Sequence, residues 1–421
     1  MGSISPQVGE KQFKTPWVET PLVESSALSR AAGCRIFLKL ENVQPSGSFK
    51  SRAMGNQILS HLTKPENANR PVHFFASSGG NAGLAAVCAA RSLGYPCTVV
   101  VPLSTKPLMI GKLRTAGAAD VIQHGVNFNE AGEYMREVIM KTPNPSDPED
   151  IVKIALHPFD NEPIWEGNST IVDELAAQLP EVSPEEQSNY QSRPLPLDAI
   201  ICSVGGGGLL NGLIMGLERY KKLNPKVTTR QLEANPVHLL AIETAGTDSL
   251  ARAVSQKSHI SLDKITSQAT SLGAIRVSEK TYNYALSPPP GMSVHPAVFS
   301  DADAARGVLR LADEERLLVE LACGVCVEAA VGDGAAKRGT KRKRVGGSGH
   351  RDEGYGDDRS SADEEVSEAN GAVSEELGSK LKEFVPDLNK DSRVVIVVCG
   401  GSNVTIDMAA DYRKQLNEGW E

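Results

Sequence analysis

Six short apolar runs recur along the sequence, and none shows the regular polar alternation of a strand with one face in water. The runs are Arg35–Glu41, Pro96–Pro102, Ala118–Gly125, Asp198–Gly205, His238–Glu243 and Ser392–Gly400. Such runs are typical of strands covered on both faces, as in parallel sheets flanked by helices. Segments with helical periodicity lie between them, such as 82–94 and 169–179, and Ser169 and Thr170 are predicted to cap the second. The sequence therefore predicts an α/β protein.

The size and charge of the chain narrow the range of partners. Its 421 residues are enough for two domains, and 44 basic against 52 acidic residues give a net charge of −8. This balance offers no overall attraction for nucleic acid or for an anionic membrane. The sequence has no apolar stretch of membrane-spanning length and no secretory signal. We therefore expect a cytoplasmic protein that binds a small polar molecule, and neither membrane nor nucleic acid.

Seven cysteines are spread along the chain, mostly in apolar surroundings, which is typical of reduced thiols in a cytosolic protein. Cys323 and Cys326 form a CGVC motif, for which a redox pair or half of a zinc site is the functional interpretation. No second CxxC or HxxxH accompanies the motif, so core packing is the favoured interpretation.

Two segments are predicted to be surface insertions, Ser183–Pro196 and a longer one over about 332–374. The longer one has almost no apolar residues, so we expect it to be disordered. Its basic cluster, Lys337–Arg344, is compatible with nuclear import or a nucleic-acid patch, but a solvated loop is favoured because an acidic block follows.

Four consecutive glycines, Gly205–Gly208, follow the apolar run that starts at Asp198 and precede a helical segment. In this position successive backbone N–H groups can point at one anion, assisted by the helix N-terminus. The spacing is neither that of a P-loop nor that of a dinucleotide fingerprint. The motif therefore predicts a phosphate site, with a flexible turn as the alternative.

Three further motifs sit at predicted ends of strands. Lys50 lies in PSGSFKSR, where partial desolvation would favour the neutral amine that attacks carbonyls, although a surface lysine is the alternative. The segment SSGGNAG, Ser77–Gly83, offers hydroxyl, amide and N–H groups for a carboxylate, or is only a glycine-rich helix cap. The segment VCGGSN, Val398–Asn403, ends the last apolar run, where ligands of open α/β sheets bind, although Cys399 alone would be interpreted as a core thiol.

The four motifs, in this order, resemble those of the fold-type II pyridoxal-phosphate enzymes, and within them the L-serine/L-threonine dehydratase branch. The resemblance covers nearly the whole chain outside the two insertions, and 157–167 and 241–250 support it. It implies two open, mostly parallel sheets flanked by helices, as in the tryptophan synthase β-like fold, with the cofactor between the domains. The implied domains are a large one, 1–43 and 149–421, and a small one, 44–148. The family's EPACG departs here to ELACG, with Leu321 in place of proline.

The resemblance implies a role for each motif in holding pyridoxal 5′-phosphate. Lys50 is similar to the family's Schiff-base lysine, which also removes the α-proton, and Phe49 to the aromatic residue beside the ring. Asn81 matches the asparagine that binds the ring hydroxyl, and Cys399 falls where the family faces the ring nitrogen. The phosphate loop corresponds to Gly205, Gly206, Gly207 and Gly208.

Substrate and cation sites are also implied by the resemblance. The loop that grips the substrate carboxylate corresponds to Ser78, Gly79, Gly80 and Asn81. A monovalent cation, potassium, is expected at Glu243, Thr247, Leu272 and Ala274. For Glu243, the alternative is a simple acidic residue at a strand end.

The implied reaction is the conversion of L-serine to pyruvate and ammonia, with L-threonine to 2-oxobutyrate as a second candidate. Many threonine-specific relatives carry serine at the position of Cys399, which favours L-serine. Serine racemase and threonine dehydratase are alternatives, and so is a non-catalytic, cofactor-binding regulatory protein. The resemblance further implies a homodimer and a role in amino-acid catabolism and gluconeogenesis.

Overall fold

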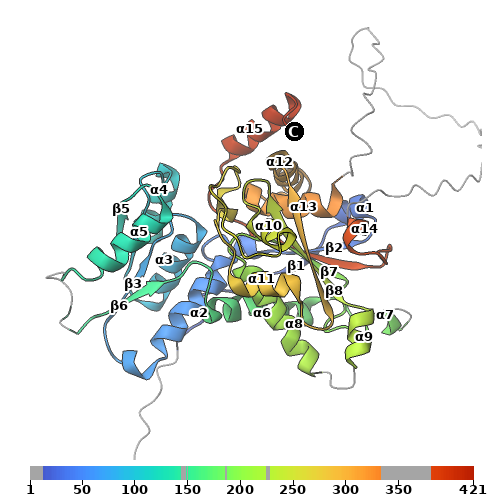
Figure 1. Ribbon diagram of the computed structural model, residues 1–421, viewed down its shortest axis with the longest axis horizontal. Helices are drawn as coiled ribbons and strands as arrows, with labels where there is room; N and C mark the ends of the chain where they lie inside the picture. Colours follow the sequence, from blue (N-terminus) through green and yellow to red (C-terminus); the bar gives the residue numbers. More distant parts are fainter. Residues whose placement is uncertain (1–12, 144–147, 149, 185–186, 224–227, 333–380) are drawn as a thin grey trace, which may run out of the picture.

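The computed structural model describes residues 13–143, 148, 150–184, 187–223, 228–332 and 381–421. Two open sheets form separate lobes, a smaller one with β3 to β6 and a larger one with the remaining strands (Figure 1). Helices flank both sheets, so the predicted α/β class with two mostly parallel sheets is confirmed.

The larger sheet has six strands in the order β1-β2-β10-β7-β8-β9. Its strands are β1 (Leu22–Glu24), β2 (Arg35–Lys39), β7 (Ala199–Ser203), β8 (Val237–Thr244), β9 (Met292–Phe299) and β10 (Arg393–Val397). Strand β1 runs antiparallel to β2, and every other neighbouring pair is parallel. Each residue of β7 and β10 is buried, as the uninterrupted apolar runs predicted.

The smaller sheet has four parallel strands in the order β5-β4-β3-β6. Its strands are β3 (Val72–Ala76), β4 (Cys97–Val101), β5 (Asp120–Gln123) and β6 (Val152–Leu156). The helices of this lobe are α2 (Lys50–Leu62), α3 (Asn81–Leu93), α4 (Pro107–Ala116) and α5 (Phe128–Tyr134). Helix α2 packs against α3 of its own lobe and against α6 of the other, so it joins the two.

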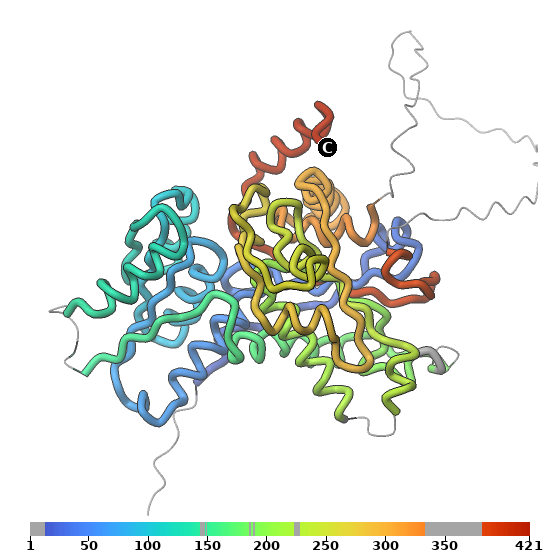
Figure 2. Tube along the Cα trace, in the orientation of Figure 1, coloured from blue at the N-terminus to red at the C-terminus, as the bar shows by residue number. Residues whose placement is uncertain are grey.

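The helices of the larger lobe cover both faces of the six-stranded sheet. They are α1 (Ser26–Ala32), α6 (Glu162–Gln178), α7 (Gln187–Tyr190), α8 (Gly208–Leu223), α9 (Thr229–Ala234), α10 (Ser249–Ser255), α11 (Glu279–Leu286), α12 (Asp301–Arg310), α13 (Leu321–Val331), α14 (Leu381–Phe384) and α15 (Ile406–Asn417). Helices α1, α12 and α13 lie on one side of the sheet and α6 and α8 on the other, while α15 stands beside α12 at the edge of the lobe (Figures 1 and 2).

The start of α6 differs from the sequence prediction. Its N-cap is Asn161, whose side chain accepts from the backbone N–H of Ile164, and a proline follows in the first turn. Ser169, the predicted cap, lies inside the helix and donates its hydroxyl to the carbonyl of Glu166 at 2.6 Å. The prediction of a cap at Ser169 and Thr170 was therefore wrong.

The two predicted insertions have different outcomes. The basic cluster 337–344, and the longer insertion beyond Gly332, lie outside the described residues. In the shorter one, Leu195 is buried in the core and Tyr190 donates its hydroxyl to Asp198 at 2.8 Å. Part of that segment is therefore packed on the larger lobe.

Among the described residues, none of the helices combines the length and the apolar character needed to cross a lipid bilayer.

The predicted small domain ended at residue 148, whereas β6 pairs with β3 in the smaller sheet. We therefore propose that the small domain extends through β6.

A buried ion network fixes the first turn of α2. The guanidinium of Arg52, which is completely buried, donates two hydrogen bonds of 2.8 and 2.7 Å to Glu41, also completely buried. It donates two more, of 2.6 and 2.8 Å, to Glu174 on α6. Lys39 on β2 also pairs with Glu174. Since bidentate pairs fix direction as well as distance, this network holds α2 against β2 and α6.

Candidate active site

The segment Val398–Asn403 contacts the other three motifs. After β10, Cys399 accepts a hydrogen bond of 3.2 Å at its carbonyl from the backbone N–H of Phe49, in the lysine motif. Its thiol lies 3.6 Å from the hydroxyl of Ser203, two residues before the glycine run. The backbone N–H of Ser402 donates to the Asn81 side chain at 2.9 Å. The structure therefore brings the four motifs to one place, where the carboxyl ends of β7 and β10 face the smaller lobe.

Lys50 is the first residue of α2, and Phe49 immediately precedes it. Its amino group donates to the carbonyl of Pro158 at 2.8 Å and lies 5.2 Å from the centre of the Phe49 ring. Burial desolvates the ammonium form and lowers the pKa of Lys50 to about 8. Near neutral pH, Lys50 is therefore a neutral amine far more often than a solvated lysine, and the neutral amine is the form that attacks a carbonyl.

The glycine run Gly205–Gly208 connects β7 to α8. In the described part of the chain, no acceptor is found for its backbone N–H groups. Gly207 has a φ of +92°, and a Cβ there would lie 1.9 Å from the Thr281 hydroxyl. At Gly206 a Cβ would lie 2.1 Å from the ring of Phe159. The loop therefore needs glycine for its conformation and packing, and its free donors at a helix N-terminus suit a phosphate.

The loop Ser77–Gly83 leads from β3 into α3. A Cβ at Gly79 would lie 2.7 Å from Cγ2 of Thr105, and one at Gly83 would lie 1.8 Å from the carbonyl oxygen of Ser78. The Ser78 hydroxyl accepts from the backbone N–H of Gly80 at 3.3 Å. These close approaches hold the loop tightly on the N-terminus of α3, as an anion-binding loop requires.

Asn81 is held by residues of the larger lobe. Its carbonyl oxygen accepts from Ser402, and its amide donates to Glu320 at 3.0 Å. Glu320 also accepts from the backbone N–H of Asn403 at 2.6 Å and from the Ser271 hydroxyl. This role of Glu320 was not predicted from the sequence, although Glu320 is the first residue of the ELACG segment.

Cys399 is buried, and desolvation of the thiolate raises the pKa of its thiol to about 11. It is therefore a neutral thiol at physiological pH. Cys399 contacts Ser203 and Phe49, and Phe49 directly precedes Lys50. That Cys399 faces the ring nitrogen of the cofactor remains a prediction.

Glu243 is the penultimate residue of β8 and is completely buried. Its two carboxylate oxygens accept from the backbone N–H groups of Leu250 and Ala251, each at 2.8 Å, at the start of α10. Burial raises the pKa of Glu243 to about 8. Thr247 lies in the same turn and donates to the carbonyl of Thr244 at 3.0 Å. A helix-capping role is thus visible for Glu243, and the cation site remains a prediction.

Leu272, another predicted cation ligand, lies beside the glycine loop. A Cβ at Gly205 would be 3.3 Å from its carbonyl oxygen, which also accepts a hydrogen bond from the N–H of Ala274 at 2.7 Å.

Cys323 and Cys326 are completely buried free thiols. The described residues contain no cluster of three or more acidic, histidine or cysteine side chains that could hold a metal.

A family model described as pyridoxal-phosphate dependent enzyme matches residues 14–346 of this chain. The chain belongs to this family. It is 39% identical over 311 residues to an L-serine dehydratase of Saccharomyces cerevisiae (strain AWRI1631), a match that covers 74% of this chain and 84% of the relative. It is also 31% identical over 399 residues to the L-serine dehydratase/L-threonine deaminase of Homo sapiens, with 95% of each chain covered.

Solved structures agree with the sequence relatives. A fungal L-serine ammonia-lyase from Rhizomucor miehei has a TM-score of 0.69 at 27% identity, covering 96% of this chain and 99% of that one. Maize serine racemase shares the fold, with a TM-score of 0.64 at 19% identity, covering 96% and 93% of the two chains. The predicted family and fold are therefore confirmed.

The residues present fit pyridoxal phosphate. The donors of Gly205–Gly208 have no acceptor in the described chain, and the amine of Lys50 has a lowered pKa. Cys399 joins the ends of β7 and β10 between these two groups. The amine of Lys50 could therefore react with the aldehyde of the cofactor, and the N–H groups of Gly205–Gly208 could bind its phosphate.

Proposed function

We propose that this protein is an L-serine dehydratase, which converts L-serine to pyruvate and ammonia, and that it also accepts L-threonine. One observation carries the proposal: the desolvated amine of Lys50 lies near Cys399. The thiol of Cys399 contacts Ser203 at the end of β7, and that strand leads into Gly205–Gly208, whose N–H groups have no acceptor in the described chain. The family membership and the L-serine dehydratase names of relatives at 39% identity support the same reaction.

Pyridoxal phosphate, when bound, supplies the electron sink for charge that develops at the substrate α-carbon. Lys50 would hold the cofactor covalently and, once released by the substrate, take the proton from the α-carbon as general base. The N–H groups of Gly205–Gly208 would hold the phosphate. Phe49 would flank the ring, and Asn81 would bind its hydroxyl after exchanging a hydrogen bond that it now makes to Glu320 or Ser402.

The loop that contains Ser78, Gly79 and Gly80 would bind the substrate carboxylate at the N-terminus of α3. Gly79 has no side chain, and a Cβ there would lie 2.7 Å from Cγ2 of Thr105, so close packing fixes the shape of this loop. A β-methyl group changes binding by about 1 to 3 kcal/mol, which makes L-threonine a slower or faster substrate but not an excluded one. The mouse relative, 36% identical, carries both substrates in its name.

A variant of Lys50 tests the proposal directly. The purified protein should show the visible absorption band of the lysine-bound cofactor and release pyruvate from L-serine in a coupled assay. Lys50→Ala should lose both, whereas Lys64→Ala, at an exposed lysine beyond the end of α2, should keep both. A Lys50→Ala variant with undiminished turnover would refute the mechanism. A parent protein with the band but no turnover of either amino acid would instead support a non-catalytic, cofactor-binding protein.

Four finer features belong to the same proposal. We expect a homodimer, a cytoplasmic location, a role in amino-acid catabolism that feeds gluconeogenesis, and a monovalent cation, potassium, at Glu243, Thr247, Leu272 and Ala274. The Glu243 carboxyl is completely buried, which raises its pKa to about 8, and a cation bound there would favour its ionised form. Turnover in potassium, compared with turnover in tetramethylammonium, would test the cation, and light scattering the dimer.

A further inference from the structure

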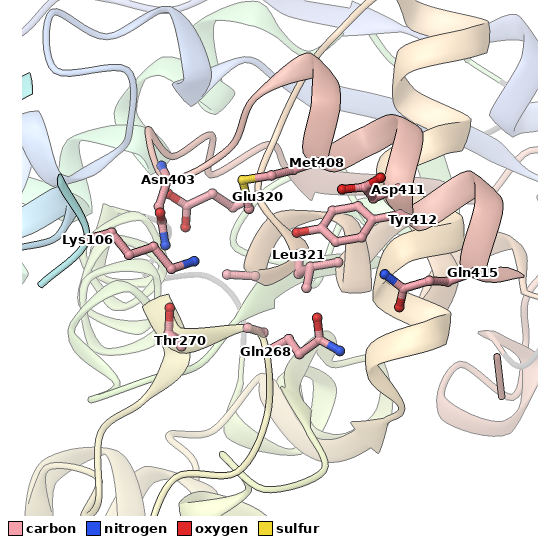
Figure 3. Close-up of a pocket in the computed structure, with 12 residues that line it drawn as sticks. Lys106, Gln268, Thr270, Glu320, Leu321, Asn403, Met408, Asp411, Tyr412 and Gln415 are labelled. Carbon is pink, nitrogen blue, oxygen red and sulfur yellow. The ribbon is translucent and has the colours of Figure 1, made fainter. Parts of the chain in front are cut away.

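A cavity lies beside Glu320, which also accepts a hydrogen bond from Asn81. Its volume is about 310 Å³, and it opens between the start of α4, the loop before Leu272, the start of α13 and helix α15 (Figure 3). None of the residues assigned above to the cofactor or to the substrate lines it. The cavity therefore lies outside those residues, and it borders the candidate active site at Glu320 and Asn403.

Opposite charges face the cavity from its two sides. Lys106, just before α4 in the smaller lobe, extends its amino group into the cavity, and Asp411 lies on α15 beyond it (Figure 3). In the described part of the chain, neither side chain has a hydrogen bond or an ion pair. Each charge is therefore free for a ligand.

The rest of the lining suits a small polar molecule with a short apolar part. Gln268, Tyr412 and Gln415 offer neutral hydrogen-bonding groups, and Leu321 and Met408 offer apolar surface. Few polar groups on a partly apolar lining are typical of a small-molecule site, and 310 Å³ is at the lower end of the usual range.

Glu320 adds no available charge, because both of its oxygens are occupied. One accepts from Asn81 and from the backbone N–H of Asn403, and the other accepts from Ser271. Of the charged groups that line the cavity, this leaves one cation and one anion. A phosphorylated ligand would meet one lysine and the repulsion of Asp411, and a metal ion would find one free carboxylate.

We propose that this cavity binds a small zwitterion, a molecule of amino-acid size with one carboxylate and one ammonium group. Its carboxylate pairs with Lys106, its ammonium group pairs with Asp411, and its stem lies on Leu321 and Met408. The proposal does not depend on the reaction at Lys50.

The position of this site lets its occupant contact both lobes. Lys106 precedes α4 of the smaller lobe and Asp411 lies on α15 of the larger one, so a ligand that pairs with both bridges the two lobes.

Titration calorimetry on the cofactor-loaded protein tests the site. The probes are glycine, β-alanine, 4-aminobutyrate and 6-aminohexanoate, which vary the separation of the two charges. Each titration is repeated while the visible band of the cofactor is recorded, since a ligand at the Lys50 site perturbs that band. We expect at least one probe to bind saturably without changing the band.

Matched variants identify the groups that bind it. Asp411→Asn and Lys106→Met should each weaken that binding by about two- to fivefold, because both side chains are exposed and contacts between exposed charges are weak. Asp407→Asn and Lys414→Met, exposed on the same helix but outside the cavity lining, should leave it unchanged. The proposal is overturned if no probe binds, if binding always changes the cofactor band, or if Asp411→Asn binds as tightly as the parent.

Discussion

Arg52→Met removes the guanidinium that pairs with two interior carboxylates and keeps a side chain of similar reach. Glu41, completely buried, would lose both of its contacts with Arg52 and keep only the uncharged donors of Thr20 and Gln44. Glu174 would keep Lys39 and the backbone N–H of Thr20. An uncompensated charge in the interior costs about 3 to 5 kcal/mol of the free energy of unfolding. Because Arg52 lies two residues after Lys50, we also expect weaker cofactor binding.

Arg35→Met is the matched control. Arg35 makes the same bidentate contact with Glu24, through two hydrogen bonds of 2.8 Å, but their side chains are 29% and 39% exposed. Such a pair contributes only about 0 to 1 kcal/mol. The two variants lose contacts of the same bidentate geometry but different burial, so the difference between their stability losses reports the effect of burial.

The assay is urea unfolding monitored by circular dichroism. If the dependence of the unfolding free energy on urea concentration has the same slope in each variant, a shift of the midpoint reports a change of stability. Adding Glu41→Gln to Arg52→Met should recover part of the loss, since a neutral amide costs less to leave unpaired than a carboxylate. Equal losses for Arg52→Met and Arg35→Met, or no recovery in the double variant, would refute the reasoning.

Two further perturbations test the glycine loop and the histidine pair of the larger sheet. Gly207→Ala should lose about 2 to 4 kcal/mol of stability and most of its cofactor affinity, because φ is +92° and Thr281 occupies the space of the Cβ. Gly94→Ala, with a φ of +84° and no atom within 4 Å, should lose only about 1 to 2 kcal/mol in the same unfolding assay and bind cofactor normally. Burial, and then the neighbouring His295, whose ring nitrogen lies 2.9 Å away, lower the pKa of His238 to about 4. Between pH 6.5 and 4 the unfolded chain therefore binds more protons than the folded one. As the pH is lowered through that window, the free energy of unfolding should fall by about 1 to 2 kcal/mol. His238→Gln should make this fall smaller, and an equal fall in the variant would contradict the reasoning.

The strands that the sequence predicted are those whose burial leaves a local signal. All six apolar runs became strands, including β7 and β10, because strands covered on both faces are apolar throughout. Strand β9 was not predicted, since it lies at the sheet edge, is mostly half-buried and contains Pro296. The cap of α6 was missed although Asn161 and Pro163 carry a recognisable start signal.

The candidate site was predictable to the extent that its chemistry lies in contiguous motifs. The lowered pKa of Lys50 and the free donors of Gly205–Gly208 agree with the expectation drawn from those motifs. The role of Glu320 was not predictable, because its partners Asn81, Ser271 and Asn403 come from three distant parts of the chain. Contacts of that kind depend on how the lobes pack, which no local pattern encodes.

The strand order of the larger sheet also bears on biosynthesis. Strand β10, Arg393–Val397, lies between β2 and β7, and Cys399 follows its end by two residues. During translation, strands β1 and β2 therefore emerge hundreds of residues before the neighbour that completes their sheet. Until then the exposed edges of β2 and β7 are open to pairing with other chains. A nascent or truncated chain that lacks β10 would thus need protection by chaperones, whereas the smaller lobe already has all four of its strands.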